Sequence, residues 1–311
     1  MKTGEKDKEE EAIAAQELPE EEKPPEVESE EKPTEEERPS AVKTRKPEDR
    51  PKYLNILDHG DSGVGKTWFC GTMIEAGLKV LYIVFNEDEV LTLDTRGITG
   101  YDYYVVKDYG SLWPLYLALR KNKPGYEGVI LDGLSDLQQG AKDYELSLGT
   151  VNTSFMQEAM RGNKRMFLQN WGNLLEMTRH FIDPFLKLPM HKIMTCVSEA
   201  DDDPKTGKAK IYPALQGSMQ QLIAAKFSIV AFSYIAHWGS ETYFCLTTQP
   251  HESISTKDRT GLCRVQINPK FSTFLDAMKG KKTSPSEKEA KLAKSLVVRP
   301  QITKADIKEK D

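Results

Sequence analysis

The chain has 311 residues, of which 38% are hydrophobic, and a formal net charge of −5 at pH 7. This length accommodates one large domain or two small ones. No apolar run approaches the roughly 18 residues of a transmembrane helix, the N-terminus lacks the basic and apolar regions of a secretory signal, and the four cysteines form no CxxC pair. The sequence therefore predicts a cytoplasmic protein without a membrane segment.

The charge is unevenly distributed along the chain. Residues 1–50 hold 18 Asp and Glu against 10 Lys and Arg, with many prolines and no aromatic side chain, whereas residues 51–311 hold 30 acidic and 33 basic residues. Such an acidic segment buries too little apolar surface to offset its chain entropy. We therefore predict a disordered acidic tail over 1–50, one α/β domain over 51–280 and a Lys-rich flexible tail over 281–311.

From Tyr53 onward, short β-rich runs alternate with helical segments. Helices are expected over 66–76 and 166–188, and strands over 53–59, 79–85, 103–106, 128–133, 191–198, 226–235, 242–248 and 263–267. Several strands are continuously apolar, which is typical of a largely parallel sheet covered on both faces by helices. The last, hairpin-like strands predict an antiparallel extension of that sheet.

A phosphate-binding loop lies between the first expected strand and the first expected helix. "GDSGVGKT" matches the pattern GxxxxGK[ST]. Its glycines let backbone N–H groups surround phosphate oxygens, and the helix N-terminus attracts the same anion. We expect Lys66 to reach the β- and γ-phosphates and Thr67 to bind Mg²⁺. The predicted nucleotide-binding residues are Gly60, Asp61, Ser62, Gly63, Val64, Gly65, Lys66 and Thr67.

The carboxylate that completes the metal site is predicted to be Asp132. It ends the apolar run GVILD, 66 residues after Lys66, and therefore lies at the carboxyl end of a strand. An alternative role for its side chain is to cap the helix that follows, which is compatible with metal binding.

The letters GDSGVGKT also occur in small GTPases, so guanine nucleotide is the first alternative to ATP. A GTPase needs DxxG after its third strand and NKxD to recognise guanine. DTRG at 94–97 lies only 28 residues after Lys66 and follows no separate strand. NKPG at 122–125 lacks the Asp that recognises guanine and is expected to end a helix instead of a strand. Both matches are therefore rejected, and ATP with Mg²⁺ is the predicted cofactor.

Several motifs of this chain, and the order in which they follow one another, resemble those of the bacteriophage RecA-like ATPases. These are single-domain relatives of RecA and RadA. The likeness rests on the phosphate loop, on "VILDGLSDL", on the helix around Trp171 and Gly172, and on "HKIMTCVSEADDDPKTGKAKIYPALQG" before "LIAAKFSIVAFSYI". It covers about residues 52–278. It implies a RecA-like fold, and some members of the group are single-strand annealing proteins.

The resemblance also implies further site residues. In RecA-type ATPases a Glu after the second core strand activates the attacking water; Glu87 is our first choice for it and Glu89 the alternative. The segment KDRTG at 257–261 resembles a RadA motif whose basic residues reach ATP on a neighbouring subunit. Lys257 and Arg259 are therefore predicted to act on the next protomer of a homo-oligomer, or else to contact solvent or a nucleic-acid backbone.

The sequence departs from the family where RecA has a Gln that senses the γ-phosphate, because Ser198 occupies that position. The DNA-facing loop is expected over 199–217, which mixes three lysines with Asp201, Asp202 and Asp203. The segment 140–165, with Arg161, Lys164 and Arg165 at its end, is the other candidate. Phe155 and Tyr212 are expected either to stack on bases or to be buried.

Taken together, these features predict a DNA-dependent ATPase that assembles on single-stranded DNA for phage recombination or strand annealing, in the host cytoplasm if it is phage-encoded. Two alternatives remain. One is a helicase or packaging motor of the same fold, and the other is a nucleotide-dependent assembly switch with little turnover.

Overall fold

The computed structural model describes residues 46, 53–147, 168–202, 207, 209–238, 240–262, 264–281 and 284–295. The chain divides into two units, Met1–Arg50 and Pro51–Asp311, and the helices and strands of the described residues lie in the second unit. The predicted acidic tail, except Lys46, lies outside the described residues, as do Phe155, Arg161, Lys164 and Arg165. No helix in the described part of the chain is long and apolar enough to cross a bilayer.

The body is built on one mixed sheet in the order β10-β8-β7-β1-β5-β4-β2-β3, with β6 paired to β5 and β9 to β7. The six strands from β7 to β3 in that order run parallel, and the pairs that involve β6, β8, β9 and β10 are antiparallel. The α/β prediction with an antiparallel extension is confirmed. The strands are β1 Asn55–Gly60, β2 Val80–Val84, β3 Asp102–Val105, β4 Gly128–Asp132, β5 His191–Asp202, β6 Ala209–Pro213, β7 Ile229–Trp238, β8 Glu241–Thr247, β9 Lys257–Asp258 and β10 Val265–Ile267.

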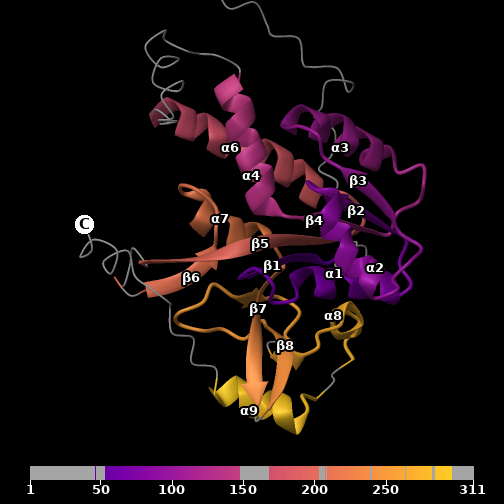
Figure 1. Cartoon of the computed structure of the whole chain (residues 1–311), viewed down its shortest axis with the longest axis vertical. Helices are drawn as coiled ribbons and strands as arrows, with labels where there is room; N and C mark the ends of the chain where they lie inside the picture. The colour runs from indigo at the N-terminus through magenta and orange to yellow at the C-terminus, as the bar shows by residue number, and fades with distance from the viewer. Residues whose placement is uncertain are drawn as a thin grey trace, which may run out of the picture. The chain divides into compact units, whose positions relative to one another are not determined.

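Helices cover both faces of the parallel part of the sheet (Figure 1). Successive strand residues point to opposite faces, so Leu57 packs into one hydrophobic core and Ile56 into the other. The first core contains side chains of α3 Leu112–Lys121, α4 Leu134–Ser147, α6 Leu168–Leu186 and α7 Met219–Lys226. The second contains side chains of α1 Lys66–Glu75, α2 Leu91–Thr95 and α8 Phe271–Met278. Two short 3₁₀ helices, η3 Glu87–Val90 and η4 Tyr109–Ser111, follow β2 and β3.

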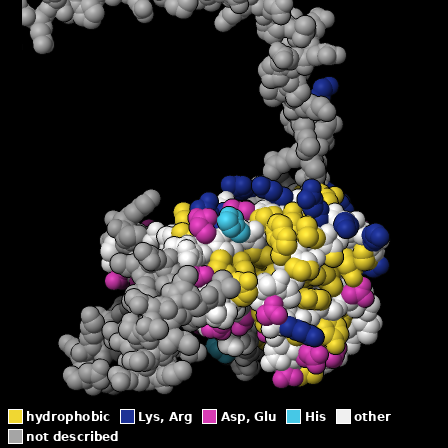
Figure 2. Space-filling view, turned by 90° about the horizontal axis from the view of Figure 1, so that it is seen from above, with side chains coloured by type: hydrophobic (Ala, Val, Ile, Leu, Met, Phe, Trp, Pro, Cys, Tyr) yellow, Lys and Arg dark blue, Asp and Glu magenta, His cyan; other side chains and the backbone are white. Residues whose placement is uncertain are grey.

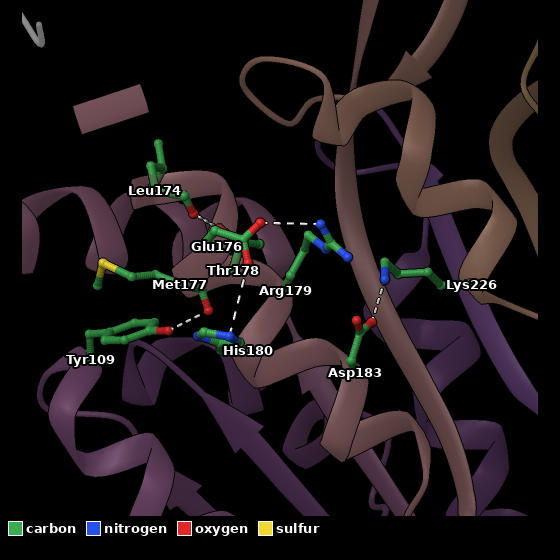
Figure 3. A network of polar contacts seen from close by, with 9 residues as sticks. All are labelled: Tyr109, Leu174, Glu176, Met177, Thr178, Arg179, His180, Asp183 and Lys226. Atoms are coloured by element: carbon green, nitrogen blue, oxygen red, sulfur yellow. Dashed lines mark hydrogen bonds and ion pairs between the residues drawn. The ribbon is translucent and has the colours of Figure 1, made fainter. Parts of the chain in front are cut away.

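The long helix α6 is fastened to its neighbours by polar contacts (Figure 3). Asp183 pairs with Lys226 at the end of α7, and the Tyr109 hydroxyl donates to the Met177 carbonyl oxygen over 2.6 Å. Pro184 lies inside the last turn of α6, where it removes one N–H from the hydrogen-bond ladder of the helix. These contacts hold α6 against η4 on one side and α7 on the other.

The predicted DNA-facing loop is largely a β-hairpin. β5 continues past the sheet to Asp202 and pairs with β6 from Ser198–Pro213 to Asp202–Ala209. After Ser198 the side chains of β5 are exposed or half-buried, and none is fully buried. Lys205 and Lys208 lie outside the described residues.

The structure differs from the predicted flexible tail over 281–311. A helix, α9 Glu287–Ser295, lies there. Its Leu292 is only 7% exposed and packs with Cys245 and Val265, and Glu289 accepts a 3.1 Å hydrogen bond from the backbone N–H of Ile267. One buried leucine in a Lys-rich sequence is too weak a hydrophobic pattern to predict a packed helix.

Candidate nucleotide-binding site

The phosphate loop joins the carboxyl end of β1 to α1 and needs glycine at defined positions. A Cβ on Gly60 would lie 2.2 Å from the Ser233 carbonyl oxygen, so only glycine permits this approach of β7. Gly63 and Gly65 have φ of +78° and +93°, the left-handed region that glycine enters without a steric penalty. Val64 is buried and anchors the loop, whereas Asp61, Ser62 and Gly63 are exposed.

The first turn of α1 is prepared for an anion. Gly65 is the N-cap residue, and no side chain caps the helix, so its leading N–H groups remain for a ligand. The Lys66 ammonium donates to the carbonyl oxygens of Gly60 at 2.9 Å and Asp61 at 2.7 Å. The lysine is therefore folded over the loop, at the position predicted for phosphate contact.

Asp132 is the hub of the site. Its Oδ2 accepts from the hydroxyls of Thr67 at 2.9 Å and Tyr82 at 2.7 Å, and its Oδ1 accepts from the Thr195 hydroxyl. These donors come from α1, β2 and β5. Among the described residues the carboxylate caps no helix, so the alternative role of Asp132 as an N-cap finds no support.

Thr67 and Asp132 fit a Mg²⁺ ion that is shared with a nucleotide. Mg²⁺ is commonly held by one or two protein oxygens together with substrate phosphates and water. Thr67 and Asp132 supply such a pair beside the uncapped N-terminus of α1. The described residues contain no group of three or more His, Cys, Asp and Glu side chains that would form a metal cage without a nucleotide.

A second buried carboxyl group, Asp58, was not predicted from the sequence. It is fully buried on β1, accepts a 2.7 Å hydrogen bond from Ser233, and its other oxygen has no hydrogen-bond partner in the described structure. Burial raises the pKa of Asp58 to about 7, against the hydrogen bond from Ser233 and the positive charge of Lys66, and Asp132 adds to the rise. The letters LDH at the end of an apolar strand were the available signal.

The two glutamates after β2 have different environments. Glu87 is exposed and makes no side-chain hydrogen bond or ion pair within the described chain. Glu89 is half-buried, and its Oε2 accepts from the Phe85 backbone N–H at 3.1 Å, one residue beyond the Val84–Asp132 pair of the sheet. Burial raises the pKa of Glu89 to about 7, to which Asp132 and Asp136 contribute. Glu89, the alternative of the sequence analysis, therefore lies close enough to Asp132 for the two charges to interact.

Comparison with known proteins assigns this site to a family. A family model described as an AAA domain matches residues 52–260, more than half of the chain. The chain belongs to the AAA domain family. This membership makes it a P-loop NTPase domain and agrees with the phosphate loop and Asp132 described above.

Two solved structures are similar at low identity. A flagellar accessory protein FlaH from Methanocaldococcus jannaschii has 12% identity and a TM-score of 0.33, covering 63% of this chain and 78% of its own. A KaiC-like protein from Pyrococcus horikoshii OT3 has 10% identity and a TM-score of 0.38, covering 69% and 84%. Comparison with curated proteins gave no match.

Lys257 and Arg259, the two basic residues of the segment KDRTG, have different surroundings. The Lys257 ammonium donates to the carbonyl oxygens of Ala224, Ala225 and Phe227 at 3.0, 3.1 and 2.8 Å, so it caps the C-terminus of α7. In this structure Lys257 therefore has a structural role, and its predicted contact with ATP on a neighbouring subunit stays a prediction. Arg259 is exposed, and its guanidinium makes no polar contact among the described residues.

Arg259 also lies far from its own phosphate loop. The backbone N–H of Arg259 donates to the carbonyl oxygen of Ser228. The backbone N–H of Ser228 in turn donates to the carbonyl oxygen of Asn55, the first residue of β1. Gly60 is five residues further along β1, which corresponds to about 16 Å at roughly 3.3 Å per residue. Arg259 therefore lies near the amino ends of the parallel strands, away from its own phosphate loop.

Packing decides the surroundings of two further residues, Tyr212 and Arg96. Tyr212 is 6% exposed, so the base-stacking alternative is wrong for it and the burial alternative is confirmed. Arg96, from the rejected DTRG match, lies with its guanidinium carbon 4.3 Å from the centre of the Trp68 ring and donates to the Trp68 carbonyl oxygen at 2.7 Å. This stack fixes the second residue after Lys66 and is a contact that the sequence did not indicate.

Proposed function

We propose that the protein is a Mg²⁺-dependent ATPase that acts on single-stranded DNA in recombination or strand annealing, of the kind that bacteriophages encode. The observation that carries the ATPase part is the convergence of Lys66, Thr67, Asp132 and Glu89 at the carboxyl edge of the sheet. The loop and the start of α1 supply Lys66 and Thr67, β4 supplies Asp132, and η3 supplies Glu89.

The roles of these residues follow from their chemistry. The loop N–H groups and Lys66 bind the phosphate chain and stabilise the charge that develops on the transferred phosphoryl group. Thr67 and Asp132 hold Mg²⁺, which when bound neutralises phosphate charge. Glu89 orients a water molecule and accepts its proton, for which a pKa near 7 is suited. Glu87, exposed to solvent, is not needed for any of these steps.

Support for single-stranded DNA comes from a groove of about 820 Å³ between η4, α3, α4 and α6. Trp113 and Tyr144 line it and are 53% and 38% exposed. In the view of Figure 2, Lys and Arg side chains lie at the margin of a hydrophobic surface patch of the described residues. Exposed aromatic rings are stacking platforms for bases, and Tyr144 belongs to the segment 140–165, the second candidate for DNA contact in the sequence analysis. Glu145 and Glu176 also line the groove, which favours base stacking there over phosphate binding.

The DNA proposal is tested by ATP hydrolysis and by binding of a labelled oligo-dT at low salt. We expect single-stranded DNA to stimulate hydrolysis, and Trp113→Ala and Tyr144→Ala to weaken DNA binding about 5- to 100-fold, the effect of losing one stacked base. Tyr103→Ala is the matched control, because Tyr103 is equally exposed but lies outside this groove. Directional duplex unwinding would favour a motor, ATP-dependent assembly with negligible turnover would favour a switch, and absence of DNA binding would refute the proposal.

We also propose that ATP sites are completed between protomers of a homo-oligomer, with Arg259 as the residue supplied by the neighbour. The support is its exposed guanidinium at the edge opposite its own loop. Mixing Lys66→Ala with Arg259→Ala subunits is expected to restore up to about a quarter of wild-type hydrolysis, because one class of interface then pairs an intact loop with an intact arginine. No recovery in mixtures that do form mixed oligomers would place Arg259 outside the neighbouring site.

A further inference from the structure

His59 is a fully buried polar side chain that the chemistry described above does not use. It directly precedes Gly60, the first glycine of the phosphate loop. Its Nδ1 lies 2.9 Å from the Ser198 hydroxyl oxygen, and its Nε2 lies 2.7 Å from the Ser255 carbonyl oxygen. One imidazole thus joins three segments that are far apart in the sequence.

The partners of His59 settle which ring nitrogen carries the proton. A carbonyl oxygen only accepts, so Nε2 must donate to Ser255. Burial lowers the pKa of His59 to about 4, with Lys66 acting in the same direction, so the ring is neutral at physiological pH and has one N–H. Nδ1 is therefore an acceptor, and the Ser198 hydroxyl donates its proton to it.

Ser198 and Ser255, the two partners of His59, each connect it to a larger segment of the fold. Ser198 follows Val197, which pairs with Gly60 in the parallel sheet, and it opens the β5–β6 hairpin by pairing with Pro213. The Ser255 N–H donates to the Ile211 carbonyl oxygen of β6 at 2.8 Å, and Arg259 follows Ser255 by four residues. His59 therefore lies where the phosphate loop, the hairpin and the Arg259 segment meet.

A serine hydroxyl has a single proton, which limits Ser198 to one donated hydrogen bond at a time. Donation to His59 and donation to a phosphate oxygen are therefore mutually exclusive. Ser198 lies one residue beyond the Val197–Gly60 pair, next to the phosphate loop, so a phosphate oxygen bound in the loop would be its alternative acceptor. A side chain with two exclusive partners is a two-state element of the kind that couples ligand binding to a distant segment.

We propose that His59 is a positioning residue that competes with bound nucleotide for the Ser198 hydroxyl and thereby couples the phosphate loop to the β5–β6 hairpin and the Arg259 segment. This inference rests on the proposed ATP site. It assigns Ser198 a defined partner without nucleotide, His59, whereas the sequence indicated only that Ser198 replaces the γ-phosphate-sensing Gln of RecA.

The test is amide hydrogen exchange of residues 198–202, 209–213 and 253–259 in the full chain, with and without Mg²⁺ and a non-hydrolysable ATP analogue. In the wild type, the analogue is expected to change exchange in all three segments. His59→Gln keeps a donor that can reach Ser255 but no longer has an acceptor at the Nδ1 position that Ser198 uses, and Ser198→Ala removes the same bond from its other end. Both variants should bind the analogue within about threefold of wild type and lose most of the nucleotide-dependent exchange change in the hairpin.

Turnover supplies a second readout. Loss of the one hydrogen bond should lower kcat about threefold to tenfold with KM nearly unchanged, and the double variant should lose no more than either single variant. Ser228→Ala is the matched control, since its hydroxyl also bonds to β1, at Asn55, but at the other edge of the sheet. Ser198→Ala carries the test if His59→Gln fails to fold.

The outcomes separate this inference from the proposed function. If the wild type binds the analogue but hydrogen exchange in the hairpin does not change, the inference alone is overturned. The same holds if Ser198→Ala shows as large a nucleotide-dependent change in exchange as the wild type. Failure of the wild type to bind the analogue overturns the ATP site itself.

Discussion

Replacing Glu89 by glutamine is expected to lower the turnover number for ATP by about 10²- to 10⁴-fold, the usual contribution of a general base. Glutamine keeps an oxygen that accepts the 3.1 Å hydrogen bond from the Phe85 N–H, so binding of Mg²⁺·ATP should change little. The measurement is steady-state phosphate release together with analogue affinity. Loss of turnover without loss of binding identifies a group that acts in the chemical step.

Glu87→Gln is the matched control, because it makes the same change two residues away at an exposed position. It should retain hydrolysis within about twofold, as surface substitutions usually do. The reverse pattern, with Glu87→Gln inactive and Glu89→Gln active, would restore the first choice of the sequence analysis and contradict the assignment made from the structure.

The same assignment predicts a pH dependence. A general base acts in its deprotonated form, and the pKa of Glu89 is raised to about 7 by burial and by Asp132 and Asp136. Wild-type kcat should therefore rise with pH between about 6 and 8 and then level off, whereas the residual rate of Glu89→Gln should lack this step.

Replacing Asp132 by alanine is expected to have the second large effect. It removes the metal carboxylate and leaves the hydroxyls of Thr67, Tyr82 and Thr195 without their acceptor. We expect hydrolysis to fall by at least about 10²-fold and the free energy of unfolding to fall by about 1–3 kcal/mol, the cost of buried polar groups left unsatisfied. Turnover at several Mg²⁺ concentrations and thermal unfolding measure the two effects.

Asp132→Asn separates the two effects, since it keeps one oxygen acceptor but not the charge. It should recover most of the stability and little of the activity. Asp102→Asn is the control, because Asp102 also accepts from a tyrosine hydroxyl, that of Tyr126 at 2.7 Å, but at the start of β3. Full activity in Asp132→Ala would remove Asp132 from the metal site.

The phosphate loop and Asp132 were predictable because their signals are local. Eight consecutive residues define the loop, and an acid that ends an apolar strand must lie at the carboxyl edge of a parallel sheet. Gly65 and Lys66 fall at the start of α1 as expected, and Asp132 ends β4.

Other parts of the site depend on contacts between segments that no local pattern encodes. Glu89 instead of Glu87 points back to the strand because a 3₁₀ turn follows β2. Lys257 caps α7 about thirty residues earlier in the chain, which its RadA-like context did not indicate. His59 and Ser198 are 139 residues apart and meet only because β1 and β5 are neighbours.

The central claim is that the loop around Lys66 is a Mg²⁺-dependent ATP site. The most direct measurement compares wild type with Lys66→Ala for binding and hydrolysis of ATP and of GTP, with Mg²⁺ and with EDTA. The absence of the GTPase motifs from the sequence predicts that wild type binds ATP in preference to GTP. The site around Lys66, Thr67 and Asp132 predicts hydrolysis only with Mg²⁺, and a loss of at least about 10²-fold in turnover for Lys66→Ala while it remains folded. Equal hydrolysis by wild type and Lys66→Ala, or turnover of GTP alone, would contradict the claim.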